Sequence, residues 1–170
     1  MGHLENDLDY GLKVLAAEMA TASTALDWLA KEVHANAQRK GFYADRDKVL
    51  DALYREAPDT PTDASTSGQI DNYKAFGDVL AWFYSTVEQA QIARIHSELS
   101  EWLEAVRNDK DGKRALDKHC PEFLSAEIEA ADVIIRVLDT CNYRGYRIGK
   151  AVIEKMKYNA GRSYKHSKNS

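Results

Sequence analysis

The stretch Glu129-Ala-Ala-Asp132-Val-Ile-Ile-Arg136-Val-Leu-Asp139 decides the fold class that this sequence predicts. As a helix it is apolar around nearly its whole circumference, which is typical of a buried helix. Its only polar stripe is formed by Glu129, Asp132 and Arg136, spaced i, i+3 and i+7. A buried carboxylate is costly unless it is paired or bound to a metal ion. The stripe therefore predicts either a structural salt bridge through Arg136 or a cation site.

A second carboxylate pair, Glu98 and Glu101, lies upstream with the same i, i+3 spacing. On a helix this spacing puts both side chains on one face. Alone, such a pair is typical of a solvated face, but four carboxylates from two facing helices supply the oxygen ligands that hard divalent cations need. None of the five histidines completes the Glu-x-x-His motif of di-iron bundles, so the pattern favours Mg²⁺, with Mn²⁺ as the other option, over a di-metal oxidase.

Helical spacing of apolar residues continues along the rest of the chain, and alternating strand patterns are absent. We expect one or two helices up to about residue 38, then helices over 46–56, 73–106 with a bend at Gly77, 122–141 and 148–159. These form an all-α bundle of four to five helices plus extra N-terminal helices. Residues 1–170 are interpreted as one domain, with an N-terminal extension (1–25), a polar linker (57–69) and a basic tail (161–170).

Composition excludes several classes of protein. The chain has 170 residues, 44% of them hydrophobic and 29% charged, with a net charge of −4. These values are typical of a soluble globular protein and argue against a duplex-binding protein. The longest stretch without a charge is nine residues, 79–87, too short to span a membrane. The start resembles no signal peptide, so we expect a cytoplasmic protein with two reduced cysteines.

The last expected helix carries Lys155, Asn159 and Arg162 at i, i+4 and i+7. Ile148 and Val152 fall on the same face, so these polar groups extend an apolar stripe inward. Facing a metal site, they are suited to hold a triphosphate, because Lys and Arg neutralise phosphate charge that the metal leaves. The alternative is a basic last turn, favoured by the helix dipole.

Four blocks together resemble the MazG-like nucleoside triphosphate pyrophosphohydrolases of bacteria and phages. The blocks run in the family's order and cover most of residues 30–166. They are His34-Ala-Asn36-Ala-Gln-Arg-Lys40-Gly41-Phe42-Tyr43, Ile95-His-Ser-Glu98-Leu-Ser-Glu101-Trp-Leu-Glu104-Ala-Val-Arg107, Glu129-Ala-Ala-Asp132-Val-Ile-Ile-Arg136-Val-Leu-Asp139, and Lys155-Met-Lys-Tyr-Asn159-Ala-Gly-Arg162-Ser-Tyr-Lys-His166.

The resemblance implies Mg²⁺-dependent hydrolysis of a nucleoside triphosphate to the monophosphate and pyrophosphate, by a homodimer or a dimer of dimers. By the same resemblance the metal ligands are Glu98, Glu101, Glu129 and Asp132. The alternative within this set is that one glutamate of the first pair, Glu98 or Glu101, positions the attacking water instead of binding the metal directly. The resemblance also implies that the phosphates are bound by Lys155, Asn159 and Arg162. No covalent nucleophile is required for this reaction, because the two cysteines and the scattered serines show no convincing triad, and the sequence has no Gly-rich phosphate loop.

The base-binding residues are predicted from chemistry. Asn36 offers a donor and an acceptor for a base edge, and three aromatic side chains offer stacking faces: Phe42, Tyr43 and Trp102. For each aromatic residue a core position is the alternative. The rival function is a non-catalytic helical adaptor that keeps the bundle, although an adaptor would be expected to lose part of the acidic and basic sets.

The long helix predicts self-association. It is apolar at spaced positions that a lone bundle would leave exposed, so we expect at least a dimer packed through these helices. The positions are Phe76, Leu80, Trp82, Phe83 and Val87.

Overall fold

The computed structural model describes the backbone of residues 2–108 and 115–160, with side chains from residue 13 onward. Within these ranges every regular element is a helix, which confirms the all-α class. The helices are α1 (Gly2–Arg39), α2 (Ala44–Arg55), α3 (Ser67–Asn108), α4 (Ser125–Tyr143) and α5 (Ile148–Ala160). The basic tail, 161–170, lies outside the described residues.

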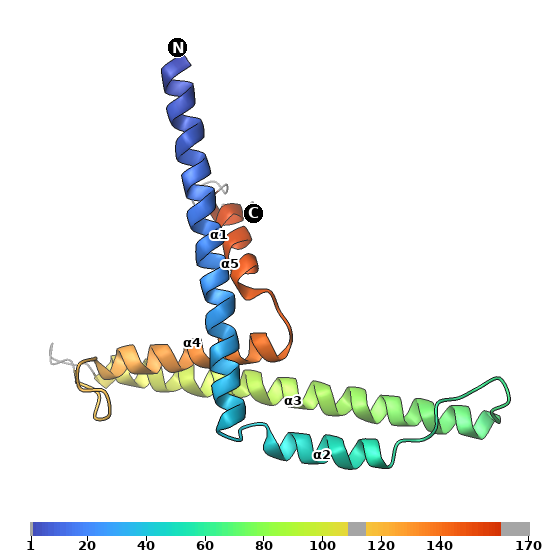
Figure 1. Ribbon diagram of the computed structural model, residues 1–170. Coiled ribbons are helices and arrows are strands. Elements are labelled where there is room, and N and C mark those ends of the chain that lie inside the picture. Colours follow the sequence, from blue (N-terminus) through green and yellow to red (C-terminus); the bar gives the residue numbers. More distant parts are fainter. Residues whose placement is uncertain (1, 109–114, 161–170) are drawn as a thin grey trace, which may run out of the picture.

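The helices form two crossed layers rather than a closed bundle (Figure 1). α5 packs lengthwise against α1, and α4 packs along the C-terminal half of α3. The lower half of α1 crosses α4, which joins the two layers. α2 lies beside the N-terminal half of α3, and both extend away from the crossing. α4 is therefore the central helix, in contact with α1, α3 and α5.

Local chemistry explains where the helices end. α1 and α4 are each followed by a glycine in the left-handed region, Gly41 (φ 77°) and Gly145 (φ 66°), as at many helix C-termini. The first turn of α4 is closed by Glu127, whose Oε2 accepts a hydrogen bond from the Leu124 N–H (2.7 Å). Gly77 does not interrupt α3, which is one helix of 42 residues. The polar linker predicted over 57–69 is shorter in the structure, because α3 already begins at Ser67.

The start of α5 is fixed tightly against α1. The Gly149 N–H donates to Asp27 Oδ1 (2.8 Å), which places a carboxylate at the positive end of the α5 dipole. A Cβ at residue 149 would lie 2.1 Å from the Ser23 carbonyl oxygen. Only glycine therefore permits this approach, and the contact sets the direction in which α5 leaves α4.

One expectation about α4 is wrong. The sequence predicted a helix buried all round, but Ile134 is 55% and Ile135 43% exposed, whereas Leu138 is buried. The reason is that α4 is covered by α1 and α3 on two sides only. Burial is low across the described chain, whose buried hydrophobic residues are Ala30, Ala37, Tyr43 and Leu138. Among the described residues, no helix combines the length and the apolar character that crossing a membrane requires.

Candidate metal centre

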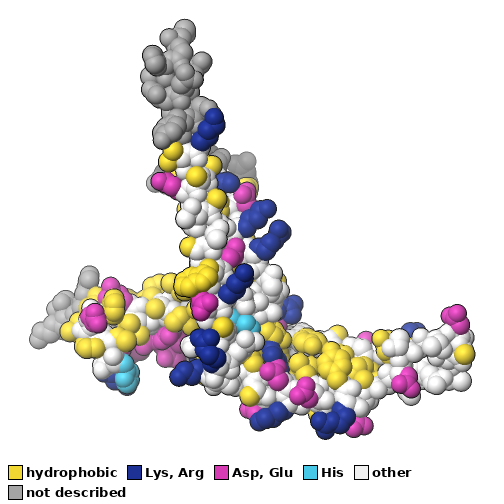
Figure 2. Space-filling model, viewed as in Figure 1, with side chains coloured by type: hydrophobic (Ala, Val, Ile, Leu, Met, Phe, Trp, Pro, Cys, Tyr) yellow, Lys and Arg dark blue, Asp and Glu magenta, His cyan; other side chains and the backbone are white. Residues whose placement is uncertain are grey.

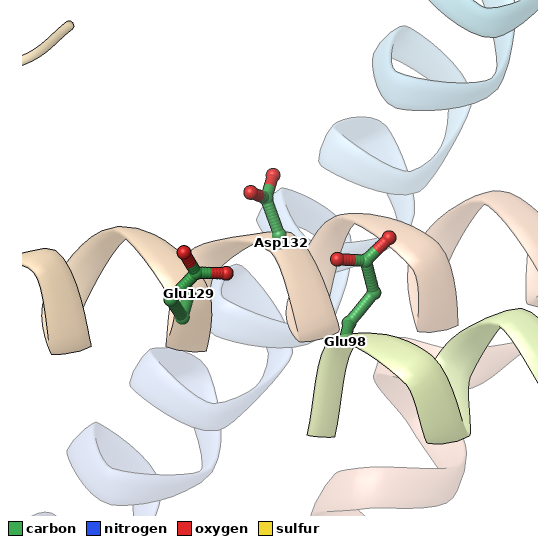
Figure 3. A group of neighbouring side chains, drawn as sticks. All are labelled: Glu98, Glu129 and Asp132. Carbon is green, nitrogen blue, oxygen red and sulfur yellow. The ribbon is translucent and has the colours of Figure 1, made fainter. Parts of the chain in front are cut away.

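Three carboxylates meet where α3 and α4 lie side by side. Glu98 projects from α3, and Glu129 and Asp132 project from successive turns of α4 (Figure 3). One oxygen of each lies within 4.8 Å of the others, and all three side chains are half-buried. The i, i+3 spacing on α4 and the side-by-side packing of the two helices produce this acidic triad.

The electrostatics of the acidic triad show that its charges repel one another. Burial is the main cause that raises the pKa of Glu129, and Glu101 and Asp132 add to the shift. Burial likewise raises the pKa of Asp132, followed by the negative charge of Glu98. A bound cation would relieve this repulsion.

The fit to Mg²⁺ can be tested on geometry. Neighbouring ligands of an octahedral Mg²⁺ lie roughly 3 Å apart and opposite ligands about 4 Å, because the metal–oxygen distance is close to 2.1 Å. The oxygens of the acidic triad, within 4.8 Å of one another, reach these separations with small rotations of flexible side chains. Three carboxylates leave positions open for water or phosphate oxygens, which Mg²⁺ usually retains.

Arg136 contacts the edge of the acidic triad. Its Nε donates to Glu98 Oε1 (2.9 Å), and its guanidinium lies 5.7 Å from the centre of the Phe42 ring. The salt bridge that the sequence offered as an alternative therefore exists, but it reaches Glu98 rather than Glu129 or Asp132. A salt bridge and a cation site are therefore compatible, because Arg136 neutralises the charge of Glu98 and leaves the carboxylates of Glu129 and Asp132 for a cation.

The remaining predicted ligand, Glu101, lies at the rim. It is exposed and accepts a hydrogen bond from Ser97 Oγ (3.4 Å). It is not part of the acidic triad, although its charge raises the pKa of Glu129.

The structure does not bring the predicted phosphate-binding residues to the acidic triad. Lys155 and Asn159 are exposed on α5, which runs along α1 and away from α3 (Figure 1). The Lys155 ammonium lies 4.8 Å from the centre of the Tyr158 ring. Arg162 lies outside the described residues.

Two of the predicted base-binding residues line one cavity. Asn36 and Phe42 border a hollow of about 110 Å³ together with Arg136 and Asp139, closed by Val33, Ala37 and Ile135. Through Arg136 this cavity adjoins Glu98. Trp102, one turn beyond Glu98, is 39% exposed and does not line it.

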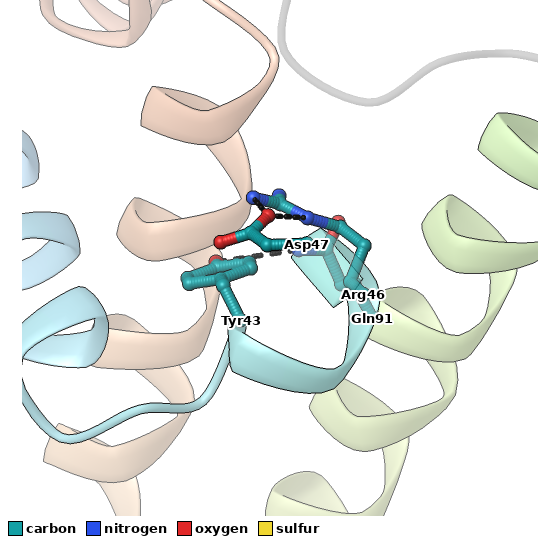
Figure 4. Close-up of polar contacts among 4 residues, drawn as sticks. All are labelled: Tyr43, Arg46, Asp47 and Gln91. Carbon is teal, nitrogen blue, oxygen red and sulfur yellow. Dashed lines mark hydrogen bonds and ion pairs between the residues drawn. The ribbon is translucent and has the colours of Figure 1, made fainter. Parts of the chain in front are cut away.

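Tyr43 is a core residue, the alternative that the sequence left open. Its ring stacks on Tyr143 (centroids 5.6 Å apart), and the Arg46 guanidinium lies 4.6 Å from its centre. Its hydroxyl accepts a hydrogen bond from Gln91 Nε2 (3.3 Å), while Arg46 pairs with Asp47 (Figure 4). Burial and hydrogen bonding to Asp139 raise the Tyr43 pKa, which keeps the phenol neutral.

A buried histidine–aspartate pair lies beside Tyr43. His34 Nδ1 lies 2.7 Å from Asp139 Oδ1, and each side chain is 12% exposed. Asp139 was not predicted as a site residue from the sequence. The signal was present, because Asp139 extends the polar stripe of α4 by one further step, seven residues after Asp132.

Comparison with known proteins found no match among protein-family models, and none at a significant level among curated proteins or solved structures.

Proposed function

We propose that this protein is a Mg²⁺-dependent nucleoside triphosphate pyrophosphohydrolase that releases a monophosphate and pyrophosphate. The observation that carries the proposal is the convergence of Glu98, Glu129 and Asp132 from two helices onto one point. Two sequence motifs, whose first carboxylates Glu98 and Glu129 are 31 residues apart, predicted the two helices, and the packing of these helices produced the acidic triad. Such a site suits a hard cation that bridges carboxylates to phosphate oxygens.

The chain's own residues supply binding and orientation. When bound, a divalent cation would polarise a phosphoryl oxygen and lower the pKa of a coordinated water. Glu101, exposed at the rim, would accept a proton from an attacking water. The cavity beside Phe42 and Asn36 would hold the base, whose polar edge would meet the Asn36 amide.

The assignment of phosphate contacts to Lys155, Asn159 and Arg162 stays a prediction. Arg136 is a described cation that forms an ion pair with the acidic triad, through Glu98. It adds a planar donor group between the base cavity and the carboxylates, a geometry suited to a phosphate oxygen.

Phosphorus NMR of nucleoside triphosphate digests tests the proposal directly. We expect pyrophosphate and a monophosphate as the first products, and no activity after chelation of the metal. Inorganic phosphate with a diphosphate as first products would contradict the mechanism. Asp132→Asn should remove the activity while far-ultraviolet circular dichroism stays unchanged, and Glu104→Gln, an exposed acid on α3 outside the acidic triad, should retain it.

The second candidate is a non-catalytic adaptor protein. The observation that favours it is the large apolar surface that one chain leaves exposed, including Trp28 (61%) and Trp82 (68%). The nucleotide assay separates the two functions. An adaptor would release no product from any triphosphate at any Mg²⁺ concentration.

A further inference from the structure

A second cavity, here called the Gln91 cavity, lies where three parts of the chain meet. The loop between α1 and α2 supplies aromatic side chains that include Tyr43, α3 supplies Gln91 and Arg94, and α4 supplies the remaining wall. The volume of the Gln91 cavity is about 10 Å³, close to the smallest volume that holds one water molecule, roughly 10–15 Å³. It is therefore too small for a base or a nucleotide. The α4 residues are Arg136, Asp139 and Thr140.

One atom in the wall of the Gln91 cavity is buried without a partner. The Gln91 residue is 8% exposed, and within the described part of the chain no group donates a hydrogen bond to its side-chain oxygen, Oε1. A buried acceptor that has lost its hydrogen bond to water is destabilising, and nearly all such atoms in native proteins have a partner. Gln91 Oε1 therefore requires a donor that the described side chains do not supply.

The hydrogen bonds around Tyr43 fix the orientation of the Gln91 amide. Burial and hydrogen bonding to Asp139 raise the pKa of Tyr43, so the phenol is neutral and donates its proton to the Asp139 carboxylate. The Tyr43 oxygen is then an acceptor, and Gln91 Nε2 donates to it (3.3 Å). Turning the amide over would bring Oε1 against the Tyr43 oxygen, so that two acceptors would face each other. The unpartnered atom is therefore Oε1 and not Nε2.

We propose that one water molecule occupies the Gln91 cavity, donates a hydrogen bond to Gln91 Oε1 and accepts one from the Arg136 guanidinium. Water meets both requirements, because an amide oxygen only accepts hydrogen bonds and a guanidinium only donates them. Arg136 is favoured as the donor over Arg94. Arg136 is held at the cavity by Glu98 (2.9 Å), whereas Arg94 is exposed and hydrated by bulk solvent.

The charges around the Gln91 cavity exclude an ion as its occupant. Arg94 and Arg136 bring two positive charges to the wall, and Lys and Arg side chains also lie around the lower end of α1, near the crossing of the helices (Figure 2). The Asp139 carboxylate is already paired with His34 (2.7 Å). A cation would therefore be repelled, and an anion could not donate to Gln91 Oε1. At this volume the neutral molecule that both donates and accepts is water.

The bound water joins two hydrogen-bond networks. On one side His34, Asp139 and Tyr43 connect to Gln91, and on the other side Arg136 connects to Glu98 of the acidic triad. Hydrogen bonds then run from α1 through the core to the edge of the acidic triad. The inference does not depend on the proposed hydrolase activity, because it concerns the chain and water alone.

A high-resolution crystal structure of the wild-type protein is the first test. We expect electron density for one water molecule within about 3.2 Å of both Gln91 Oε1 and a terminal nitrogen of Arg136. No density at this position, or a protein group that donates directly to Gln91 Oε1, would overturn the proposal. A water molecule that contacts Gln91 but not Arg136 would overturn it as well, because the two networks would then be separate.

Oxygen-17 relaxation dispersion tests the same site in solution, because it counts the water molecules that stay bound for longer than the protein takes to tumble. Gln91→Met has a similar volume without the amide oxygen, and it should show one long-lived water molecule fewer than the wild-type protein. Thr140→Val is the matched control, since it removes a hydroxyl from the wall of the same cavity at nearly equal volume. It should retain the water molecule, which Gln91 and Arg136 still hold.

Equal numbers of long-lived water molecules in the wild-type protein and Gln91→Met would overturn the proposal. Loss of the water molecule in Thr140→Val would also overturn it, because Thr140 rather than Arg136 would then be the donor. Circular dichroism confirms that each variant is folded, and the wild-type crystal structure does not depend on any variant.

Discussion

Asp132 and Asp139 lie seven residues apart on the same face of α4, yet their surroundings are opposite. Asp139 is buried, with His34 Nδ1 2.7 Å from its carboxylate and Tyr43 beside it. Asp132 faces Glu98 and Glu129, whose negative charges raise its pKa. One carboxylate has its partner within the chain and the other has repelling neighbours. The difference distinguishes a structural carboxylate from one suited to a cation.

The helices that face each carboxylate cause this difference. Toward its C-terminal end α4 meets α1, which supplies His34. Toward its N-terminal end α4 meets the part of α3 that carries Glu98. Arg136, between the two aspartates, pairs with Glu98 and lines the cavity that Asp139 also borders. Arg136 therefore connects the part of α4 around Asp139 to the part that carries the acidic triad.

The largest expected effect is a difference in Mg²⁺ affinity between variants of the two aspartates. Asp132→Asn should weaken Mg²⁺ binding by about 100-fold or more, because it removes a charged ligand from the acidic triad. Asp139→Asn, the matched variant, should bind Mg²⁺ normally but lose about 1–3 kcal/mol of unfolding free energy, because His34 loses its buried partner. Titration calorimetry and urea unfolding measure both quantities. Equal metal affinity in the two variants would disprove the distinction.

A smaller effect is expected from Arg136. Arg136→Gln should weaken Mg²⁺ binding by about tenfold, since Glu98 loses the donor that orients it toward the acidic triad. Arg144→Gln is the matched control, because Arg144 also pairs a residue of α3, Glu88 (3.2 Å), and has the same 33% side-chain exposure. It should leave Mg²⁺ affinity unchanged. Tighter binding by Arg136→Gln would show that Arg136 competes with the cation instead.

The smallest effect is a dependence of stability on pH. Because burial and neighbouring carboxylates raise the pKa of Asp132 and Glu129 in the folded state, the folded chain binds their protons more tightly than the unfolded chain does. Stability from these groups is therefore present below the ordinary carboxyl pKa, near 4, and is lost as pH rises through the raised values.

The pH effect is measured by urea unfolding of metal-free protein between pH 4 and 7. Asp132→Asn, which stays neutral, should gain stability relative to wild type as the pH rises, and saturating Mg²⁺ should cancel this gain. A constant difference between the two proteins across this range would show that the Asp132 carboxylate is not destabilised in the folded state.

Periodicity and carboxylate spacing in the sequence determined the helical class, the approximate helix positions and the i, i+3 pairs, because these depend on contacts within one or two turns. Tertiary structure decided which partners each side chain met. The pairing of His34 with Asp139 joins residues 105 positions apart, and the salt bridge of Arg136 to Glu98, rather than to its neighbours on α4, follows from how α3 packs. The exposed Ile134 and Ile135 show the same limit, since an apolar helix does not specify how many helices cover it. The number of neighbours follows from long-range packing, which helical periodicity does not encode.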